Sequence, residues 1–321
     1  MRVLITGGAG YIGSTLTPLL LAAGHKVRVL DRLSYGGESL LGVWSHPDFE
    51  FVHGDIRDRE TVHKAVSDCD AVVHLAAIVG DPACAREPEI ARAVNLDAAM
   101  NIIEESRKAG VQRFVFASTC SNYGKMKDPS QFVNEESELQ PVSLYAETKV
   151  AVEKALLASA GDGWYPTPLR FATVFGVSSR MRFDLTVNEF TMEMITKKHL
   201  IVFGEQFWRP YVHVFDAARG IALILASSPQ AVAGRVFNVG STDQNLQKQQ
   251  IVELIRPLVP DAKIEFVHKN EDPRDYRVSF DRILKELGYK TTRTVVEGIV
   301  EVAKLVRTGA ISNLADNRYR N

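Results

Sequence analysis

A glycine-rich segment at residues 7–13, Gly-Gly-Ala-Gly-Tyr-Ile-Gly, constrains the fold more than any other part of the chain. It follows directly on a short apolar run at residues 3–6 and opens a segment with helical spacing that closes at Gly24. It fits both G-x-G-x-x-G and G-x-x-G-x-x-G. In this context the absent side chains let backbone amides approach a diphosphate at the amino end of a helix. The segment therefore predicts a strand, a phosphate-binding turn and a helix, in that order.

The same alternation continues to about residue 172, where short apolar runs take turns with longer segments of helical period. Strands are expected at residues 3–6, 27–31, 49–53, 71–75, 113–118 and 167–171, and helices at 11–23, 61–66, 90–109 and 144–158. Apolar runs of this length are typical of buried parallel strands. We therefore predict an α/β protein with a doubly wound (Rossmann) parallel sheet.

Beyond residue 173 the pattern loosens into a smaller α+β portion, with strand-like pieces at 200–203, 236–239 and 263–267 and short helical stretches near 186–198, 248–256 and 281–287. The apolar segment 211–227 is of the kind that packs on a large sheet. We therefore expect an NAD-binding domain over residues 1–172, with 211–238 returning to it, and a substrate domain over 173–321.

The composition indicates a folded protein of a reducing compartment. The chain of 321 residues is 45% hydrophobic and 24% charged, which excludes a disordered protein. A net charge of −1 without long runs of one sign argues against a nucleic-acid or membrane surface. Three scattered cysteines, no signal-peptide pattern and no apolar run of about 20 residues favour a cytoplasmic protein with free thiols.

A carboxylate marks the second strand, which ends at Asp31. At this place an acid accepts hydrogen bonds from both hydroxyls of an adenosine ribose and repels a 2′-phosphate. The sequence therefore favours NAD over NADP, although the neighbouring Arg32 softens the preference.

A phenol and an ammonium group stand four residues apart at Tyr145 and Lys149, on one face of a predicted helix. A nearby cation favours a phenolate, so we expect Lys149 and an oxidised nicotinamide to lower the pKa of Tyr145 toward the working pH. Thr119 follows a central strand, at the edge where doubly wound sheets bind ligands. Its hydroxyl can orient a substrate alcohol.

Together these residues resemble the extended branch of the short-chain dehydrogenase/reductase superfamily, in particular its nucleotide-sugar epimerases and dehydratases, over nearly the whole chain. The resemblance implies that Thr119, Tyr145 and Lys149 are catalytic, that the substrate is a nucleotide-diphosphate sugar and that the protein is a homodimer. The cofactor contacts expected for NAD are Gly7, Gly10, Tyr11, Ile12, Gly13, Asp31, Arg32, Asp55, Ile56, Leu75, Ala76, Ala77, Asn95, Tyr145, Lys149 and Phe171.

The second half resembles the same relatives at Asn188, which they use to hold a diphosphate, and at two arginine-bearing segments, 208–214 and 272–277. A guanidinium suits a diphosphate because it bonds two oxygens at once. The choice between Arg274 and Arg277 stays open. The expected substrate contacts are Thr119, Ser121, Thr173, Asn188, Arg209, Arg274 and Arg277, where Thr173 replaces an asparagine usual in relatives.

One departure from the family pattern separates the candidate activities. Cys120 and Ser121 stand where 4,6-dehydratases typically place Asp-Glu, and elimination of water without these carboxyl groups lacks its acid and base. The leading hypothesis is a nucleotide-sugar epimerase that oxidises C4 transiently and returns the hydride. A net C4 oxidoreductase with exchangeable cofactor would use the same residues. An NAD-sensing module would not need the catalytic set.

Other chemistries find little support in the sequence. The histidines are isolated and no paired His or Cys motif occurs, so we expect no metal site. We expect His213 to be a packed histidine. Cys120 has no histidine near it in the sequence that would activate it as a nucleophile.

Overall fold

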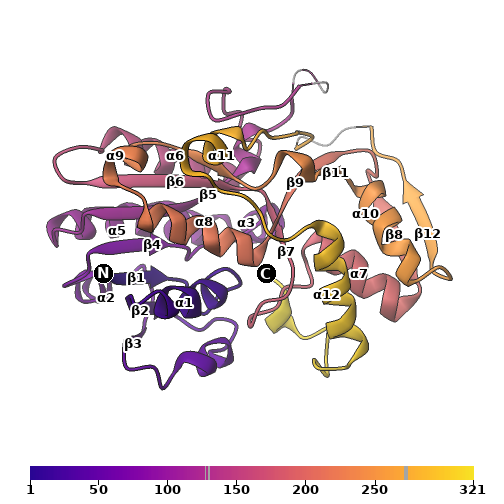
Figure 1. The fold of residues 1–321 in the computed structure, drawn as a ribbon, viewed down its shortest axis with the longest axis horizontal. Coiled ribbons are helices and arrows are strands. Elements are labelled where there is room, and N and C mark those ends of the chain that lie inside the picture. The colour runs from indigo at the N-terminus through magenta and orange to yellow at the C-terminus, as the bar shows by residue number, and fades with distance from the viewer. Residues whose placement is uncertain (127, 129–130, 271–273) are drawn as a thin grey trace.

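The computed structural model describes residues 1–126, 128, 131–270 and 274–321. A seven-stranded sheet, parallel throughout, lies between two layers of helices (Figure 1). Its strand order is β10-β6-β5-β4-β1-β2-β3, which reverses direction between β1 and β4. In doubly wound sheets this reversal opens a crevice for ligands at the carboxyl ends of the strands. The predicted fold class is confirmed.

The strands of this sheet are β1 (Arg2–Thr6), β2 (Lys26–Asp31), β3 (Phe49–His53), β4 (Ala71–His74), β5 (Arg113–Thr119), β6 (Tyr165–Phe171) and β10 (Phe237–Val239). The helices around it are α1 (Gly13–Ala22), α2 (Arg59–Val66), α3 (Asp81–Arg86), α4 (Pro88–Arg92), α5 (Ala98–Lys108), α6 (Leu144–Ala158), α8 (Val214–Ala226), α9 (Pro229–Val232) and α11 (Asp281–Leu287). All six strands expected before residue 172 are present.

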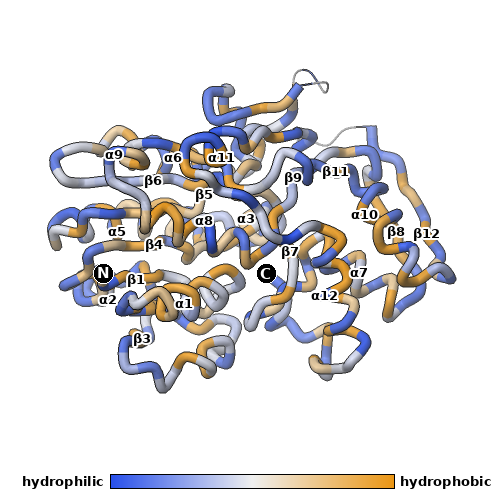
Figure 2. The backbone as a smooth tube through the Cα atoms, in the orientation of Figure 1, coloured by the Kyte–Doolittle hydropathy of each residue, from blue (hydrophilic) through white to orange (hydrophobic). Residues whose placement is uncertain are grey.

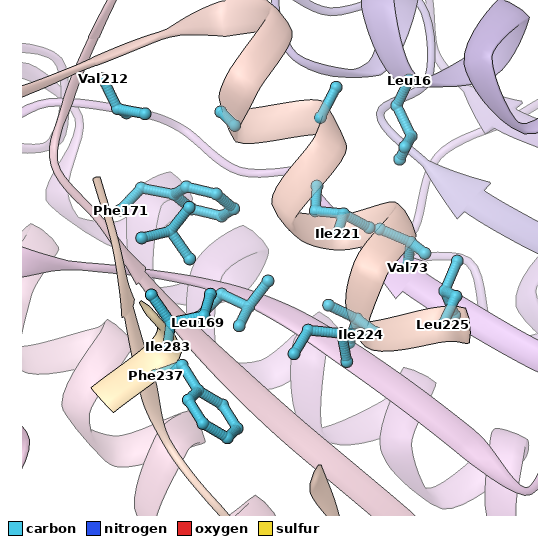
Figure 3. Packing of buried hydrophobic residues seen from close by; sticks show 14 of the residues in the cluster. Leu16, Val73, Leu169, Phe171, Val212, Ile221, Ile224, Leu225, Phe237 and Ile283 are labelled. Carbon is cyan, nitrogen blue, oxygen red and sulfur yellow. The ribbon is translucent and has the colours of Figure 1, made fainter. Parts of the chain in front are cut away.

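Two hydrophobic clusters fill the two faces of the sheet. Helices α1, α8 and α11 pack on one face, and α2, α5 and α6 on the other. Figure 3 shows Ile221, Ile224 and Leu225 extending from α8 toward the strands. Each fully buried aliphatic side chain contributes roughly 1.5 to 3 kcal/mol. In Figure 2, hydrophobic stretches lie in β1, β4, α1 and α8, and others lie in the helices of the second part of the molecule.

The second part of the molecule contains two small sheets. One has the order β11-β9-β7 and the other pairs β12 with β8. Their strands are β7 (Thr173–Phe175), β8 (His199–Phe203), β9 (Trp208–His213), β11 (Asn245–Gln247) and β12 (Lys263–Val267), accompanied by α7 (Thr186–Lys197), α10 (Lys248–Ile255) and α12 (Val295–Arg307). The remaining short turns are 3₁₀ helices at Glu38–Val43, Cys120–Tyr123, Thr242–Gln244, Arg256–Leu258 and Asn317–Tyr319.

The structure differs from the predicted helices at two places: one predicted helix is interrupted, and one helix was not predicted. The expected helix 90–109 is divided into α4 and α5 by a π-helical turn at Ala93–Asp97. The amide of Asn95 in this turn binds both backbone groups of Ile78, so a tertiary contact interrupts the regular helix. Helix α12 was not predicted, although Thr294 and Glu297 form a capping box in front of its buried apolar face.

Candidate active site

The glycine-rich segment forms a tight turn between β1 and α1. Gly7 has a φ of 76°, and a Cβ there would lie 2.7 Å from the backbone nitrogen of Ala76 at the end of β4. A Cβ on Gly13 would lie 2.4 Å from the carbonyl oxygen of Gly7. Side chains are therefore excluded from the turn. A diphosphate fits against the bare backbone at the amino end of α1.

The carboxylate of Asp31 is oriented beside this turn. One oxygen accepts a hydrogen bond of 3.0 Å from the backbone of Ala9 and the other a bond of 2.8 Å from Leu33. Burial raises the pKa of Asp31, and these two bonds oppose the rise. The acid lies at the end of β2, as a ribose-binding acid must. Arg32 instead pairs with Asp55 at 3.4 Å.

Other expected cofactor contacts lie along the same edge of the sheet, at the ends of their strands. Ile56 is buried after β3, and Leu75, Ala76 and Ala77 follow β4. Phe171 ends β6 in register with Thr119 of β5. Asn95 differs, because its buried amide is occupied by Ile78. Asn95 therefore holds the backbone of the loop that follows β4 through hydrogen bonds in the protein interior.

The catalytic pair predicted from spacing is held at the start of α6. Lys149 is 3% exposed and donates a hydrogen bond of 2.8 Å to the carbonyl oxygen of Ala117 in β5. Its ammonium nitrogen lies 4.7 Å from the ring centre of Phe116 and 5.8 Å from that of Tyr145. The helix therefore places the phenol and the cation side by side at the carboxyl end of β5.

Both acidities of this pair depart from their usual values. Burial lowers the pKa of Lys149 to about 8 and raises the pKa of Tyr145 above its usual value. In the protein without nicotinamide the pKa of Tyr145 is therefore raised, because desolvation of the phenol dominates. The expected lowering by Lys149 together with an oxidised nicotinamide stays a prediction. Among the influences that lower the pKa of Tyr145, the largest is the guanidinium of Arg182.

Thr119 ends β5, and the turn that follows it, Cys120–Tyr123, packs against α6. Its hydroxyl oxygen accepts a hydrogen bond of 3.1 Å from the backbone of Ser121. The hydroxyl of Ser121 lies 3.4 Å from the phenol oxygen of Tyr276. Thr119 and Ser121 thus stand between the end of the sheet and a residue of the second arginine-bearing segment.

Asp81 connects this segment to α6, the helix of Tyr145 and Lys149. One of its oxygens accepts a hydrogen bond of 2.7 Å from Ser143, the residue that caps α6, and the other pairs with Arg274 at 2.8 Å. The guanidinium of Arg209 donates to the carbonyl oxygen of Arg274 and lies 5.5 Å from the ring centre of Tyr276. Arg209 and Arg274 are therefore brought together next to α6.

Arg277 occupies a different place from Arg274. Its guanidinium lies 4.7 Å from the ring centre of Phe132 and 5.0 Å from that of Trp208. The structure connects Arg274 to α6 through Asp81 and places the guanidinium of Arg277 near the rings of Phe132 and Trp208. Asp272 and Pro273, which belong to the same predicted segment, lie outside the described residues.

Asn188 does not reach an open position. Its side chain is 0% exposed, its oxygen accepts from the backbone of Gly176, and its nitrogen donates toward Tyr11, Gly176 and the carbonyl oxygen of Arg182. The two N–H groups of the Asn188 amide thus have three acceptors within hydrogen-bonding distance inside the protein. Asn188 therefore has an interior role in this structure, and its expected contact with a diphosphate stays a prediction. Thr173 is half-buried in β7, opposite Tyr211.

Sequence reasoning missed Asp81, Arg180 and Arg182. The two arginines are 5% and 8% exposed and lie in the loop before α7. Their positions become visible only when this loop packs on α1, since no pattern in the sequence distinguishes them from surface arginines. His213 is buried, as expected, and its ring lies 2.7 Å from the carboxylate of Glu301.

The remaining residue types offer no other reactive centre in the part of the chain that the structure describes. All three cysteines are buried, and burial raises the pKa of the Cys120 thiol well above its usual value. Within the described residues, no group of three His, Cys, Asp or Glu side chains could hold a metal ion. Nor does any helix there have the length and apolarity to cross a membrane.

Comparison with known proteins gives the family. The model of the NAD dependent epimerase/dehydratase family matches residues 3–240. The UDP-glucose 4-epimerase of Corynebacterium glutamicum is 28% identical over 94% of each chain. The dTDP-glucose 4,6-dehydratase of Streptomyces niveus is 29% identical over 96% of this chain and 93% of the relative.

Solved structures agree with this assignment. The dTDP-glucose 4,6-dehydratase DesIV of Streptomyces venezuelae, crystallised with NAD, has a TM-score of 0.83 at 28% identity and covers 97% of both chains. The UDP-glucose 4-epimerase of Thermus thermophilus in complex with NAD has a TM-score of 0.82 at 27% identity, over 96% of this chain and 99% of that one.

The doubly wound sheet, the glycine-rich turn and the grouped Thr119, Tyr145 and Lys149 thus define a nucleotide-binding enzyme of the dehydrogenase/reductase type. The chain belongs to the NAD-dependent epimerase/dehydratase family. The predictions of an enzyme and of NAD as its cofactor are confirmed.

Proposed function

We propose that the protein is a nucleotide-sugar 4-epimerase that uses NAD. One observation carries the proposal. Thr119, Tyr145 and Lys149 are grouped at the carboxyl end of β5, and the two residues after Thr119 are Cys120 and Ser121, which supply no carboxyl group. The groups for proton removal at a sugar hydroxyl are present. The pair that relatives use to eliminate water is not.

The catalytic roles follow from the positions of these side chains. The phenol of Tyr145 exchanges a proton with the sugar 4-hydroxyl, while Thr119 holds that hydroxyl with a hydrogen bond. The ammonium group of Lys149, fixed on Ala117, stabilises the phenolate that burial disfavours. Bound NAD supplies the hydride acceptor and donor at C4. The keto sugar then rotates so that its opposite face is directed toward the bound NAD. Tyr145 returns the proton to the oxygen at C4.

The substrate class is supported by the arginines. Arg209 is 8% exposed and donates to the backbone carbonyl oxygen of Arg274, so both arginine residues lie at one end of the site, with the guanidinium of Arg274 paired to Asp81. Guanidinium groups bind the two phosphates of a nucleoside diphosphate bidentately. Asp81 is committed to Ser143 and Arg274, which argues against its use as the acid of a dehydratase.

The test is proton NMR of UDP-, GDP-, dTDP- and CDP-linked hexoses incubated with the purified protein and no added cofactor. A new anomeric signal with unchanged mass supports the epimerase. A product lighter by one water indicates a dehydratase, and turnover only with added NAD or NADH indicates a net C4 oxidoreductase. Tyr145→Phe serves as the inactive control. The expected homodimer stays a prediction, which light scattering of the same sample checks.

A further inference from the structure

A buried arginine of the second half lies at the amino end of α1. The segment 178–180 is bound to the first turn of this helix. The hydroxyl of Ser178 donates a bond of 2.7 Å to the carbonyl oxygen of Tyr11 and lies 2.9 Å from the hydroxyl of Ser14. The backbone of Arg180 donates to the same Ser14 hydroxyl at 3.3 Å. The side chain of Arg180 therefore starts beside the glycine-rich turn.

The guanidinium of Arg180 is buried without an acidic partner. The residue is 5% exposed, and Nη2 donates to the carbonyl oxygen of Arg320 at 3.1 Å and to Oδ1 of Asn321 at 2.8 Å. Its Nε is buried with no hydrogen-bond partner, and Arg180 takes part in none of the ion pairs of the described residues. A buried cation without a counter-charge is costly.

The neighbouring Arg182 shows what a compensated arginine looks like in this loop. It binds both oxygens of Asp184, at 3.0 and 2.7 Å. Burial, followed by repulsion from Arg182, lowers the pKa of Arg180 to about 10. Asp184 and Asp31 oppose this shift, but neither forms an ion pair with Arg180 among the described residues. The buried Nε therefore has room for an anion as its partner.

The direction of the Arg180 side chain indicates which anion. Its guanidinium carbon lies 3.9 Å from the ring centre of Tyr35, in the loop that follows β2. The charge of Asp31 acts on it from the end of β2. Arg180 thus lies between the amino end of α1, where a cofactor diphosphate binds, and the acid that binds the adenosine ribose.

We propose that Arg180 binds the diphosphate of NAD from its adenosine side, so that the second half of the chain clamps the cofactor held by the first. The phosphate oxygens supply the counter-charge that the guanidinium lacks and accept the hydrogen of Nε. The clamp retains the cofactor between turnovers. The proposal depends on NAD as the cofactor and not on the sugar or on epimerisation.

The test measures ligand affinity and not activity. NAD, ADP-ribose and adenosine are titrated by calorimetry into cofactor-free wild type, Arg180→Met and Arg180→Lys. For the Met variant we expect NAD and ADP-ribose to bind about 10- to 100-fold more weakly, as for a lost hydrogen bond to a charged group, and adenosine to bind as before. Arg180→Lys keeps the positive charge, so we expect its affinities for NAD and ADP-ribose to lie between those of wild type and Arg180→Met.

The matched control is Arg256→Met, an exposed arginine paired with Glu253, which should change no affinity. The cofactor-free Arg180→Met protein should melt no lower than wild type, because it loses an uncompensated charge. If it does not fold, Arg180→Gln, which keeps a donor for Arg320 and Asn321, takes its place. The proposed clamp is overturned if Arg180→Met binds ADP-ribose as tightly as wild type does, or if its affinity for adenosine falls as much as its affinity for NAD. It is also overturned if only the affinity for NAD falls.

Discussion

The phenol of Tyr11 donates a hydrogen bond of 2.6 Å to the carbonyl oxygen of Gly176. Tyr11 belongs to the glycine-rich turn, and Gly176 follows β7 in the second half. Asn188 supports the bond from the far side, at 3.1 Å from the phenol oxygen. Since Tyr11 and Gly176 belong to different halves of the chain, this buried contact helps to fix the two halves relative to each other. The hydroxyl of Tyr11 is directed at the protein and not at a cofactor.

Tyr11→Phe removes this contact and leaves the buried carbonyl oxygen of Gly176 with only the longer bond of 3.3 Å from Asn188. We expect a loss of about 1 kcal/mol in the free energy of unfolding, the usual net contribution of one hydrogen bond. Urea unfolding of cofactor-free protein measures it. Tyr165→Phe, at the first residue of β6, is the control for which we expect little change in stability. Equal stabilities of the Tyr11 variant and wild type would show that the bond contributes nothing.

The sequence predicted the sheet because each of its strands is short, apolar and bounded by turn residues, and the glycine-rich turn is a local signal. It also predicted the pairing of Tyr145 with Lys149, since both lie on one helix. It did not predict the surroundings of Asn188, which depend on contacts between segments far apart in the chain. Nor did it predict that Arg274 pairs with Asp81, because this contact joins two segments far apart in the chain.

Tyr145→Phe tests the proposed proton transfer. We expect turnover to fall by about 100-fold or more, the contribution of a general acid/base, because the phenol is the proposed proton carrier at the sugar hydroxyl. NAD affinity should stay close to that of wild type, since the ring remains in place. Steady-state assays and calorimetry measure the two quantities on the same preparation. Near-full activity of this variant would exclude Tyr145 from the chemistry.

Arg209→Ala and Arg274→Ala test where the substrate diphosphate binds. Each variant should weaken binding of the nucleoside diphosphate by about 1.5 to 3 kcal/mol, because each removes hydrogen bonds to a charged group. Calorimetry with UDP and dTDP measures the loss, and Arg256→Ala on the surface serves as the control. If both variants keep wild-type affinity, the diphosphate binds elsewhere.

His74 predicts how stability depends on pH. It is 1% exposed, its Nδ1 lies 2.7 Å from the hydroxyl of Thr6, and burial, with a smaller effect of Lys149, lowers its pKa from 6.5 to about 3. Between pH 6.5 and about 3, His74 is protonated in the unfolded chain and neutral in the folded protein. Stability is therefore fully present above pH 6.5 and falls with acidification, by about 1.4 kcal/mol per pH unit at most.

His74→Gln removes this dependence and separates it from that of the carboxylates. The difference in unfolding free energy between wild type and variant should be constant above pH 7 and shrink between pH 6.5 and 4. Urea titrations across this range measure it. Parallel curves for the two proteins would mean that His74 is protonated equally in the folded and unfolded states.

The buried ion pair between Glu153 and Arg170 holds α6, the helix of Tyr145 and Lys149, on the sheet. Glu153 follows Lys149 by one turn of α6, its side chain is 1% exposed, and it accepts a bond of 2.8 Å from Ser118, next to Thr119. Arg170 of β6 donates to both of its oxygens, at 3.1 and 3.2 Å from Nε. Together with the bond from Lys149 to Ala117, this pair fixes α6 relative to the end of β5.

Arg170→Met should cost about 3 to 5 kcal/mol, because it leaves the carboxylate of Glu153 buried without its counter-charge. The double variant with Glu153→Met should cost less than the sum of the two single changes, since it buries no unpaired charge. Urea unfolding gives all three values. Lys64→Met breaks the exposed pair with Glu60 and should leave stability unchanged. Additive effects of the two changes would mean that Glu153 and Arg170 do not stabilise each other.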